Sequence, residues 1–120
     1  MPTHLLTLGK DPAISHKFMA QLEAARPGKY TATLTHSPDE FEEYAKEQKE
    51  KIDFVLLGAA QTDDQVANAK TIVASVWGKA KESKDEPGEG LWVLRIPTSL
   101  LTKEGKEGGF IKFFLEQVEG

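Results

Sequence analysis

The chain contains no cysteine, and this absence excludes several kinds of protein at once. Without thiols there can be no disulfide framework, no thiolate-bound metal and no cysteine nucleophile. Histidine is scarce as well, and His4, His16 and His36 are too widely spaced to suggest a structural zinc site. We therefore expect no metal centre.

The chain also lacks an excess of basic residues and any long apolar run. Fifteen Lys and Arg residues stand against 19 Asp and Glu residues, giving a net charge of −4. Nucleic-acid binding generally needs a basic face, so no nucleic-acid partner is expected. No apolar run approaches the roughly 18 residues of a membrane span, and the N-terminal residues do not resemble a signal peptide. The composition predicts a soluble cytoplasmic protein without a membrane partner.

What the chain does contain is enough for one hydrophobic core. It has 120 residues, of which 39% are hydrophobic, so residues 1–120 are expected to form a single domain. A domain of this size buries roughly 65% of the surface that its unfolded chain exposes. We therefore expect it to fold without disulfide or metal support.

Apolar runs typical of strands alternate with helical patterns along the chain. Asp11, Ser37 and Thr62 each precede such a helical pattern and are suited to cap a helix. The polar stretch 81–90 is expected to be an exposed loop, and the glycine-rich stretch 98–109 to be mobile. Strands are predicted at 3–8, 30–35, 52–57 and 91–96, and helices at 12–25, 38–48, 63–82 and 110–118.

This alternation predicts an α/β fold with a parallel sheet. Strands separated by helices are joined by right-handed crossovers and run parallel. Residues 52–57 are apolar on both faces, as in a central strand, whereas residues 30–35 alternate as in an edge strand. The expected architecture is a three-layer, flavodoxin-like sandwich with a four-stranded sheet in the order 2-1-3-4.

In such a fold, ligands bind outside the carboxyl ends of the strands, where the strand order reverses. In the order 2-1-3-4 this point lies between the first and third strands. A small-molecule ligand is therefore possible at this crevice. The residues expected to border it are Gly9, Lys10, Asp11, His36, Gly58, Ala59, Gln61 and Thr98.

These residues do not form a known catalytic or cofactor motif. Gly9 stands alone where a phosphate loop needs several glycines, and Asp11 places a negative charge where a phosphate would lie. His36 or His16 with a carboxylate could transfer protons. However, Asp11 and Ser37 are explained as helix caps, and His16 is expected to face solvent. We predict no catalytic residues and no cofactor.

The small residues Gly58, Ala59 and Ala60 directly follow the expected central strand. They would allow another group to approach the backbone closely. Alternatively, the turn into the next helix needs a positive φ angle at Gly58. Both interpretations remain open on the sequence.

A surplus of apolar side chains near the end of the chain suggests an interface. Residues 91–96 are as apolar as a central strand but are expected at the sheet edge, and two phenylalanines lie off the apolar stripe of the last helix. Two alternatives are that Phe110 packs under the preceding loop and that residues 98–103 add a strand covering the edge. The predicted interface comprises Trp92, Leu94, Phe110 and Phe113.

Residues 4–58 resemble a receiver domain of a response regulator. The segments LLTLGKDPAISHKFMAQLEA and HSPDEFEEYAKEQKEKIDFVLLG carry the resemblance. Receivers hold magnesium with an acidic pair after the first strand and accept phosphate on an aspartate that ends the third. Gly9 and Lys10 occupy the first two positions here and Gly58 the third, so the resemblance implies a degenerate receiver without phosphotransfer. A degenerate dinucleotide-binding Rossmann domain is nearly as similar.

Two functions therefore remain. The first is a non-catalytic, receiver-like interaction module that forms a homodimer or binds a protein partner. The alternative is a small-molecule or nucleotide-cofactor-binding protein, or an enzyme, that uses the crevice between the first and third strands.

Overall fold

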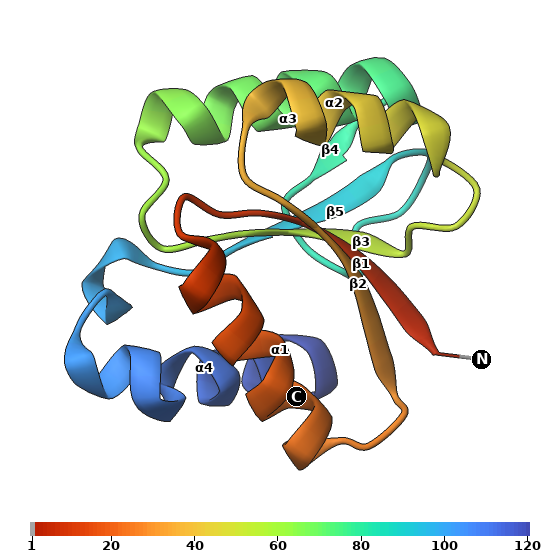
Figure 1. Cartoon of the computed structure of the whole chain (residues 1–120). Helices are drawn as coiled ribbons and strands as arrows, with labels where there is room; N and C mark the ends of the chain where they lie inside the picture. Colours follow the sequence, from red (N-terminus) through yellow and green to blue (C-terminus); the bar gives the residue numbers. More distant parts are fainter. Residues whose placement is uncertain (1) are drawn as a thin grey trace.

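The computed structural model describes residues 2–120 as one β-sheet with helices on both of its faces (Figure 1). Two short helical turns, η1 (Thr98–Leu100) and η2 (Gly105–Gly109), precede the last helix. The strands are β1 (Thr3–Leu8), β2 (Tyr30–Thr35), β3 (Phe54–Leu57), β4 (Ala80–Lys81) and β5 (Leu91–Arg95). The helices are α1 (Pro12–Ala25), α2 (Pro38–Glu47), α3 (Asp63–Trp77) and α4 (Phe110–Glu119).

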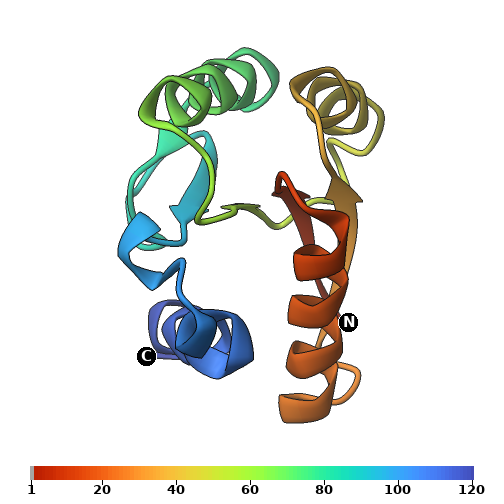
Figure 2. The ribbon, with the colours of Figure 1, turned by 60° about the vertical axis from the view of Figure 1, so that its left-hand side comes forward.

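The sheet has the order β2-β1-β3-β5-β4, and its neighbouring strands run parallel to one another. The predicted α/β class, the parallel sheet and the order of the four main strands are confirmed. Helices α2 and α3 cover one face, and α1 and α4 lie together on the other (Figure 2). The molecule is a three-layer sandwich of the flavodoxin-like type.

The structure corrects the prediction at three elements. Strand β3 begins at Phe54 rather than at residue 52. Helix α3 ends at Trp77 rather than near residue 82, because Gly78 follows with a φ of 94°, which stops a helix. Strand β4 was not predicted, since two residues are too short to show a periodicity. It pairs with Leu91 and Trp92, so β5 is not the outermost strand there.

Residues 98–103 do not add the strand that the sequence left open. Thr98–Leu100 forms the turn η1, and the chain then continues into η2. Gly105 is buried, and a Cβ atom on it would lie 1.8 Å from the Leu100 carbonyl oxygen. Only glycine therefore permits this close approach between the two turns.

The predicted helix caps are confirmed. Asp11 accepts a hydrogen bond from the Ala13 N–H at 2.9 Å, and Ser37 accepts one from the Glu40 N–H at 3.2 Å. Thr62 forms a complete capping box with the residue three positions later. These side chains satisfy backbone donors at the helix starts, which fixes where the helices leave the sheet edge.

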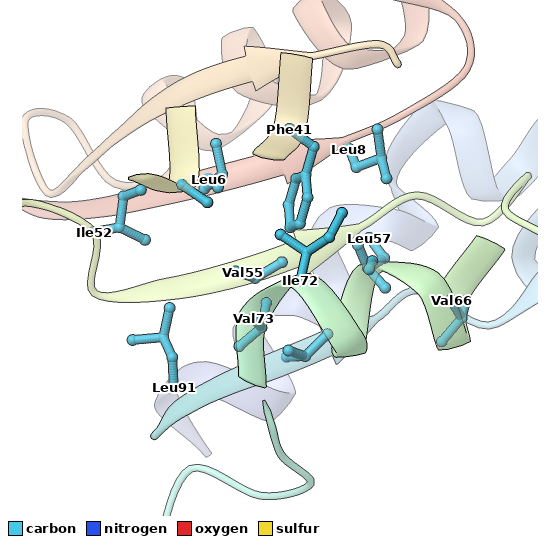
Figure 3. Packing of buried hydrophobic residues seen from close by; sticks show 13 residues of the cluster. Leu6, Leu8, Phe41, Ile52, Val55, Leu57, Val66, Ile72, Val73 and Leu91 are labelled. Carbon is cyan, nitrogen blue, oxygen red and sulfur yellow. The ribbon is translucent and has the colours of Figure 1, made fainter. Parts of the chain in front are cut away.

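Each face of the sheet has its own hydrophobic core, because successive residues of a strand point to opposite faces. Figure 3 shows the core beneath α2 and α3, where side chains of both helices point toward those of the strands. Its largest fully buried member is Phe41 of α2. On the other face, β1 and β3 contribute the alternate residues, which pack against α1 and α4: Leu5, Phe54, Leu56, Phe18, Leu22, Phe110, Ile111 and Phe114.

Phe114 of α4 lies at the centre of this second core and is fully buried. Its ring meets the rings of Phe18 and Tyr30 edge to face, with centroids 5.5 and 5.3 Å apart. It also stacks on Phe54 at 6.0 Å. Because aromatic pairs of this geometry are each worth about 0.5–1.5 kcal/mol beyond the area they bury, Phe114 is the principal anchor of α4.

The end of α4 is also tied down by a polar cluster around Glu119. Its carboxylate accepts hydrogen bonds from Lys29 Nζ at 2.6 Å, from the Tyr30 hydroxyl at 2.7 Å and from Arg26 Nε at 3.0 Å. The bonds from Lys29 and Tyr30, followed by that from Arg26, lower the pKa of Glu119 to about 2. Burial, and then the bond to Glu119, raises the pKa of Tyr30. The cluster joins α4 to the loop between α1 and β2.

Within residues 2–120, no helix is both long enough and apolar enough to cross a membrane.

Candidate functional site

A cavity of about 70 Å³ opens at the carboxyl ends of β1 and β3, on the face covered by α1 and α4. We call it the crevice. Its floor is formed by Thr7, Leu34 and Leu56, which the register of β2, β1 and β3 places side by side. Its walls and rim are Leu8, Gly9, Lys10, Asp11, Ile14, Ser15, Phe18, Gly58, Ala59, Ala60, Ile96, Leu101 and Phe110.

The crevice lies where the strand order reverses, as the topology predicts. Five of the eight predicted site residues line it: Gly9, Lys10, Asp11, Gly58 and Ala59. Most of the remaining lining is aliphatic or aromatic, which is typical of sites that bind small molecules. The location was therefore predictable, whereas the apolar walls were not.

Gly9 and Gly58 lie beside each other at the paired ends of β1 and β3. The Gly58 N–H donates to the Leu8 carbonyl oxygen at 2.9 Å, and a Cβ atom on Gly58 would lie 3.5 Å from Gly9 Cα. A Cβ atom on Gly9 would lie only 2.9 Å from the Ser15 hydroxyl. Gly58 does not have a positive φ, so the interpretation that its turn requires one is wrong. A Cβ atom at Gly58 would be in ordinary van der Waals contact, so the tighter packing is at Gly9.

Thr7 is the unusual residue of the floor. It is 7% exposed, and its Oγ1 atom has no hydrogen-bond partner among residues 2–120. Leaving a buried hydroxyl unpaired costs about 1–3 kcal/mol. Thr35 on the adjacent strand provides the contrast, since it is fully buried and its hydroxyl donates to the Thr7 carbonyl oxygen at 2.6 Å.

The charges at the rim balance each other. Lys10 and Asp11 are the two ionisable side chains among the described lining residues, and both are exposed. The Asp11 carboxylate is already bonded to the Ala13 N–H, so it compensates the positive end of the α1 dipole. The rim therefore presents neither a net charge nor a free helix terminus to an anion.

No protein-family model, curated protein or solved structure matches the chain. The function is therefore inferred from the crevice and its surroundings.

Three predicted site residues lie outside the crevice. His36 follows β2, and its backbone N–H donates to Glu40 Oε1 at 2.8 Å. Gln61 and Thr98 are instead joined by Arg95, whose Nη2 donates to the Gln61 carbonyl oxygen at 2.8 Å and to the Thr98 hydroxyl at 3.3 Å. They border the same edge of the sheet but face this arginine.

Arg95 is a residue that the sequence did not single out for this position. Besides Gln61 and Thr98, it contacts Asp63 through Nη1 at 2.9 Å. The Asp63 side chain is 93% exposed, so that ion pair contributes little, and the hydrogen bond to the partly buried backbone carries the contact. Arg95 thus holds the loop after β3 against the start of η1.

The predicted interface is only partly at the surface. Phe110 is 4% exposed and lines the crevice, and Leu94 is buried in the core, so neither offers an apolar surface to a partner. Packing under the preceding segment is the correct alternative for Phe110. Trp92 and Phe113 are half-buried, with the Trp92 ring centroid 5.0 Å from that of Phe54.

Three residues that line the crevice were not singled out from the sequence. Thr7 occupies the same strand face as Leu5, and this alternation could have placed its hydroxyl in the core. Ser15 follows the predicted cap of α1 by one turn. Leu101 is 38% exposed at the mouth, and nothing in the polar stretch 98–109 indicates that it returns to the strand ends.

A second polar network surrounds His4, at the amino end of β1 and thus at the opposite edge of the sheet. His4 is buried, and its Nδ1 and Nε2 atoms lie 2.7 and 2.9 Å from the hydroxyls of Thr31 and Thr33. Thr33 donates its proton to Gln48, so it accepts from Nε2–H and leaves Nδ1 to accept from Thr31. Burial, followed by the charge of Lys51, lowers the pKa of His4.

This network gives both ring nitrogens of His4 a hydrogen-bond partner, and the length of β1 separates it from the crevice. The backbone N–H of His4 also donates to Asp53 at 2.8 Å, which places that carboxylate at the amino edge of the sheet. Residues 2–120 contain no cluster of three or more side chains suited to hold a metal ion.

Proposed function

We propose that this protein binds a small molecule non-catalytically in the crevice. The observation that carries the proposal is that Thr7, a residue of the crevice floor, has a buried hydroxyl without a hydrogen-bond partner. Folded proteins rarely leave such a group unpaired, because its desolvation is not compensated. A ligand that supplies the missing hydrogen bond removes this cost.

The surroundings of Thr7 support the proposal. The crevice occupies the position where α/β sheets bind ligands, and its lining is mainly apolar. Its two ionisable side chains, Lys10 and Asp11, lie at the exposed rim, and Asp11 is engaged as a helix cap. No lining group is therefore held as a buried acid, base or activated nucleophile. We further propose a cytoplasmic location for this function, on the basis of the net charge of −4.

The proposal is tested by screening a library of small fragments against ¹⁵N-labelled protein. We expect binding fragments to shift the backbone amide signals of Thr7, Gly9, Gly58 and Ala60, which surround the crevice. Ala60→Leu places a larger side chain in the lining and should abolish these shifts. Ala67→Leu makes the same change on the exposed side of α3 and should preserve them.

Two outcomes would overturn the proposal. The first is a library in which no fragment shifts these amide signals. The second is fragment binding that Ala60→Leu and Ala67→Leu affect equally, because the crevice would then not be the site.

Self-association is a second candidate, favoured by the outer edge of β5. Strand β4 pairs with Leu91 and Trp92 alone, so within residues 2–120 the rest of that edge has no neighbouring strand. Trp92 and Phe113 are half-buried. A twofold contact would cover the strand edge and the two rings together.

Sedimentation equilibrium distinguishes a dimer from a monomer. If this face pairs, Phe113→Glu dissociates the dimer without unfolding it, whereas Lys112→Glu, an exposed neighbour, leaves it intact. A wild-type protein that stays monomeric at high micromolar concentration rules the dimer out.

The receiver resemblance also remains a proposal. Gly9, Lys10 and Gly58 follow β1 and β3, at the strand ends where a receiver would need its carboxylates. Incubation with acetyl phosphate and magnesium should therefore leave the mass of the protein unchanged. A phosphoryl adduct in the mass spectrum would contradict a receiver-like scaffold without phosphotransfer.

A further inference from the structure

On the floor of the crevice, Thr7 is the one polar residue among apolar neighbours, and Ser15 adds a second hydroxyl among the walls. Thr7 lies on the floor between Leu34 and Leu56, with Phe18 and Phe110 among the walls, and its hydroxyl is buried without a partner. A hydroxyl both donates and accepts a hydrogen bond, so it can pair with a ligand hydroxyl or carbonyl. A ligand end that pairs with this hydroxyl has to be polar, whereas the neighbouring side chains favour an apolar remainder.

The same surroundings disfavour a charged ligand end. No ionisable side chain lies on the floor to pair with a charge, and a buried unpaired charge is far more costly than a buried hydroxyl. At the rim, Lys10 and Asp11 carry opposite charges, and Asp11 already occupies the α1 terminus. Neither position favours an anion or a cation.

The size of the crevice limits what it can enclose. Its volume of 70 Å³ is several times the roughly 10–15 Å³ that one water molecule needs. It is half the size of the cavity of about 150 Å³ that binds benzene in an engineered protein. A narrow group therefore fits inside, and the remainder must leave through the mouth. Leu101, 38% exposed at that mouth, offers an apolar surface along this path.

We propose that the ligand is a neutral, mostly apolar molecule whose leading end is a hydroxyl or carbonyl group that pairs with the Thr7 hydroxyl, as in an aliphatic alcohol or aldehyde. This inference rests on the proposed function and specifies its ligand. The polar end enters first, the adjoining carbons pack against Phe18 and Phe110, and the chain extends past Leu101.

Three six-carbon probes that differ only at one end test this class: hexan-1-ol, hexanoate and hexylammonium. Dissociation constants come from titrations that follow the amide signals of Thr7, Gly9 and Gly58. We expect hexan-1-ol to bind at least tenfold more tightly than either ion. Thr7→Val should weaken hexan-1-ol about tenfold, whereas Thr3→Val, on the same face at the other end of β1, should leave its affinity unchanged.

The possible failures are distinguishable. If hexanoate or hexylammonium binds in the crevice as tightly as hexan-1-ol, the ligand class is wrong although the crevice is a binding site. Equal affinities of wild type and Thr7→Val for hexan-1-ol would likewise overturn the role of the hydroxyl. If neither these probes nor the fragment library shifts the crevice amides, the proposed function itself fails.

Discussion

Replacing Thr7 with valine should make the ligand-free protein more stable. Valine has the shape of threonine and the same branching at Cβ, so the preference for a strand and the packing change little. The substitution removes a hydroxyl that is buried without a partner. Because such a group costs about 1–3 kcal/mol, we expect the free energy of unfolding to rise by about 1–2 kcal/mol.

Thr35→Val is the matched control, because it makes the same change on the adjacent strand. The Thr35 hydroxyl donates a hydrogen bond of 2.6 Å to the Thr7 carbonyl oxygen, and Thr35 is fully buried. Removing the Thr35 hydroxyl takes this hydrogen bond away from the Thr7 carbonyl oxygen. We expect a decrease of about 1–3 kcal/mol, so the two substitutions should have opposite signs.

Urea unfolding followed by circular dichroism measures both effects. The comparison is valid if the dependence of the unfolding free energy on urea concentration is the same in all three proteins. If Thr7→Val lowers the free energy of unfolding as Thr35→Val does, the Thr7 hydroxyl is satisfied in the folded protein. The inference that a ligand completes the crevice floor would then be refuted.

Further predictions concern the core and the two polar networks. Phe114→Ala should lower the free energy of unfolding by about 4 kcal/mol, because Phe114 is fully buried among aromatic rings. Phe113 is half-buried, so Phe113→Ala should lower it by under about 1.5 kcal/mol. Equal losses for the two variants in urea titrations would contradict this packing. His4 has a lowered pKa, so its stabilising contribution is present above pH 6.5 and is lost as the pH falls below it; an NMR titration midpoint at or above 6.5 would disprove this. Glu119, with a pKa of about 2 against its ordinary 4.5, stabilises the fold above pH 4.5 and loses this effect as the pH falls toward 2. Glu119→Gln should therefore flatten the acid branch of a pH–stability curve, and exposed Glu116→Gln should not.

The sequence predicted the fold because the pattern of the main elements is strong. Continuous apolar runs mark the central strands, and three capped helix starts separate them. Strand β4 could not be predicted from the sequence, because its two residues belong to no periodic pattern. They are defined as a strand only by their pairing with Leu91 and Trp92. Such pairing depends on how the chain returns after α3, which no local signal reports.

The last helix shows where reasoning from one apolar stripe fails. The stripe predicted that Phe110 and Phe113 both lie off the buried face. In the structure the chain before α4 passes beside Phe110, and Gly105 lies close to its ring, with a would-be Cβ atom 3.3 Å from Cε1. A second buried direction therefore exists at the start of the helix. Phe113 lacks this cover and stays half-buried.

The candidate site divides in the same way. Its rim follows from topology alone, since Gly9 and Gly58 must meet at the carboxyl ends of adjacent parallel strands. Its floor and walls depend on which helices cover that face and on the path of residues 98–109. The partners of His4 are similarly non-local, because Thr31 and Gln48 come from β2 and the end of α2.

The crevice is assembled from distant parts of the chain: Thr7 and Phe18 come from its first elements, and Leu101 and Phe110 from its last. A bound ligand would contact both parts and hold them together. A ligand that binds only when α4 is packed against α1 stabilises this packed arrangement by mass action. Occupancy of the crevice should therefore slow any local opening in which α4 separates from α1. Amide hydrogen exchange along α4 would then report ligand concentration, and any partner that docks on α4 would sense whether the crevice is full.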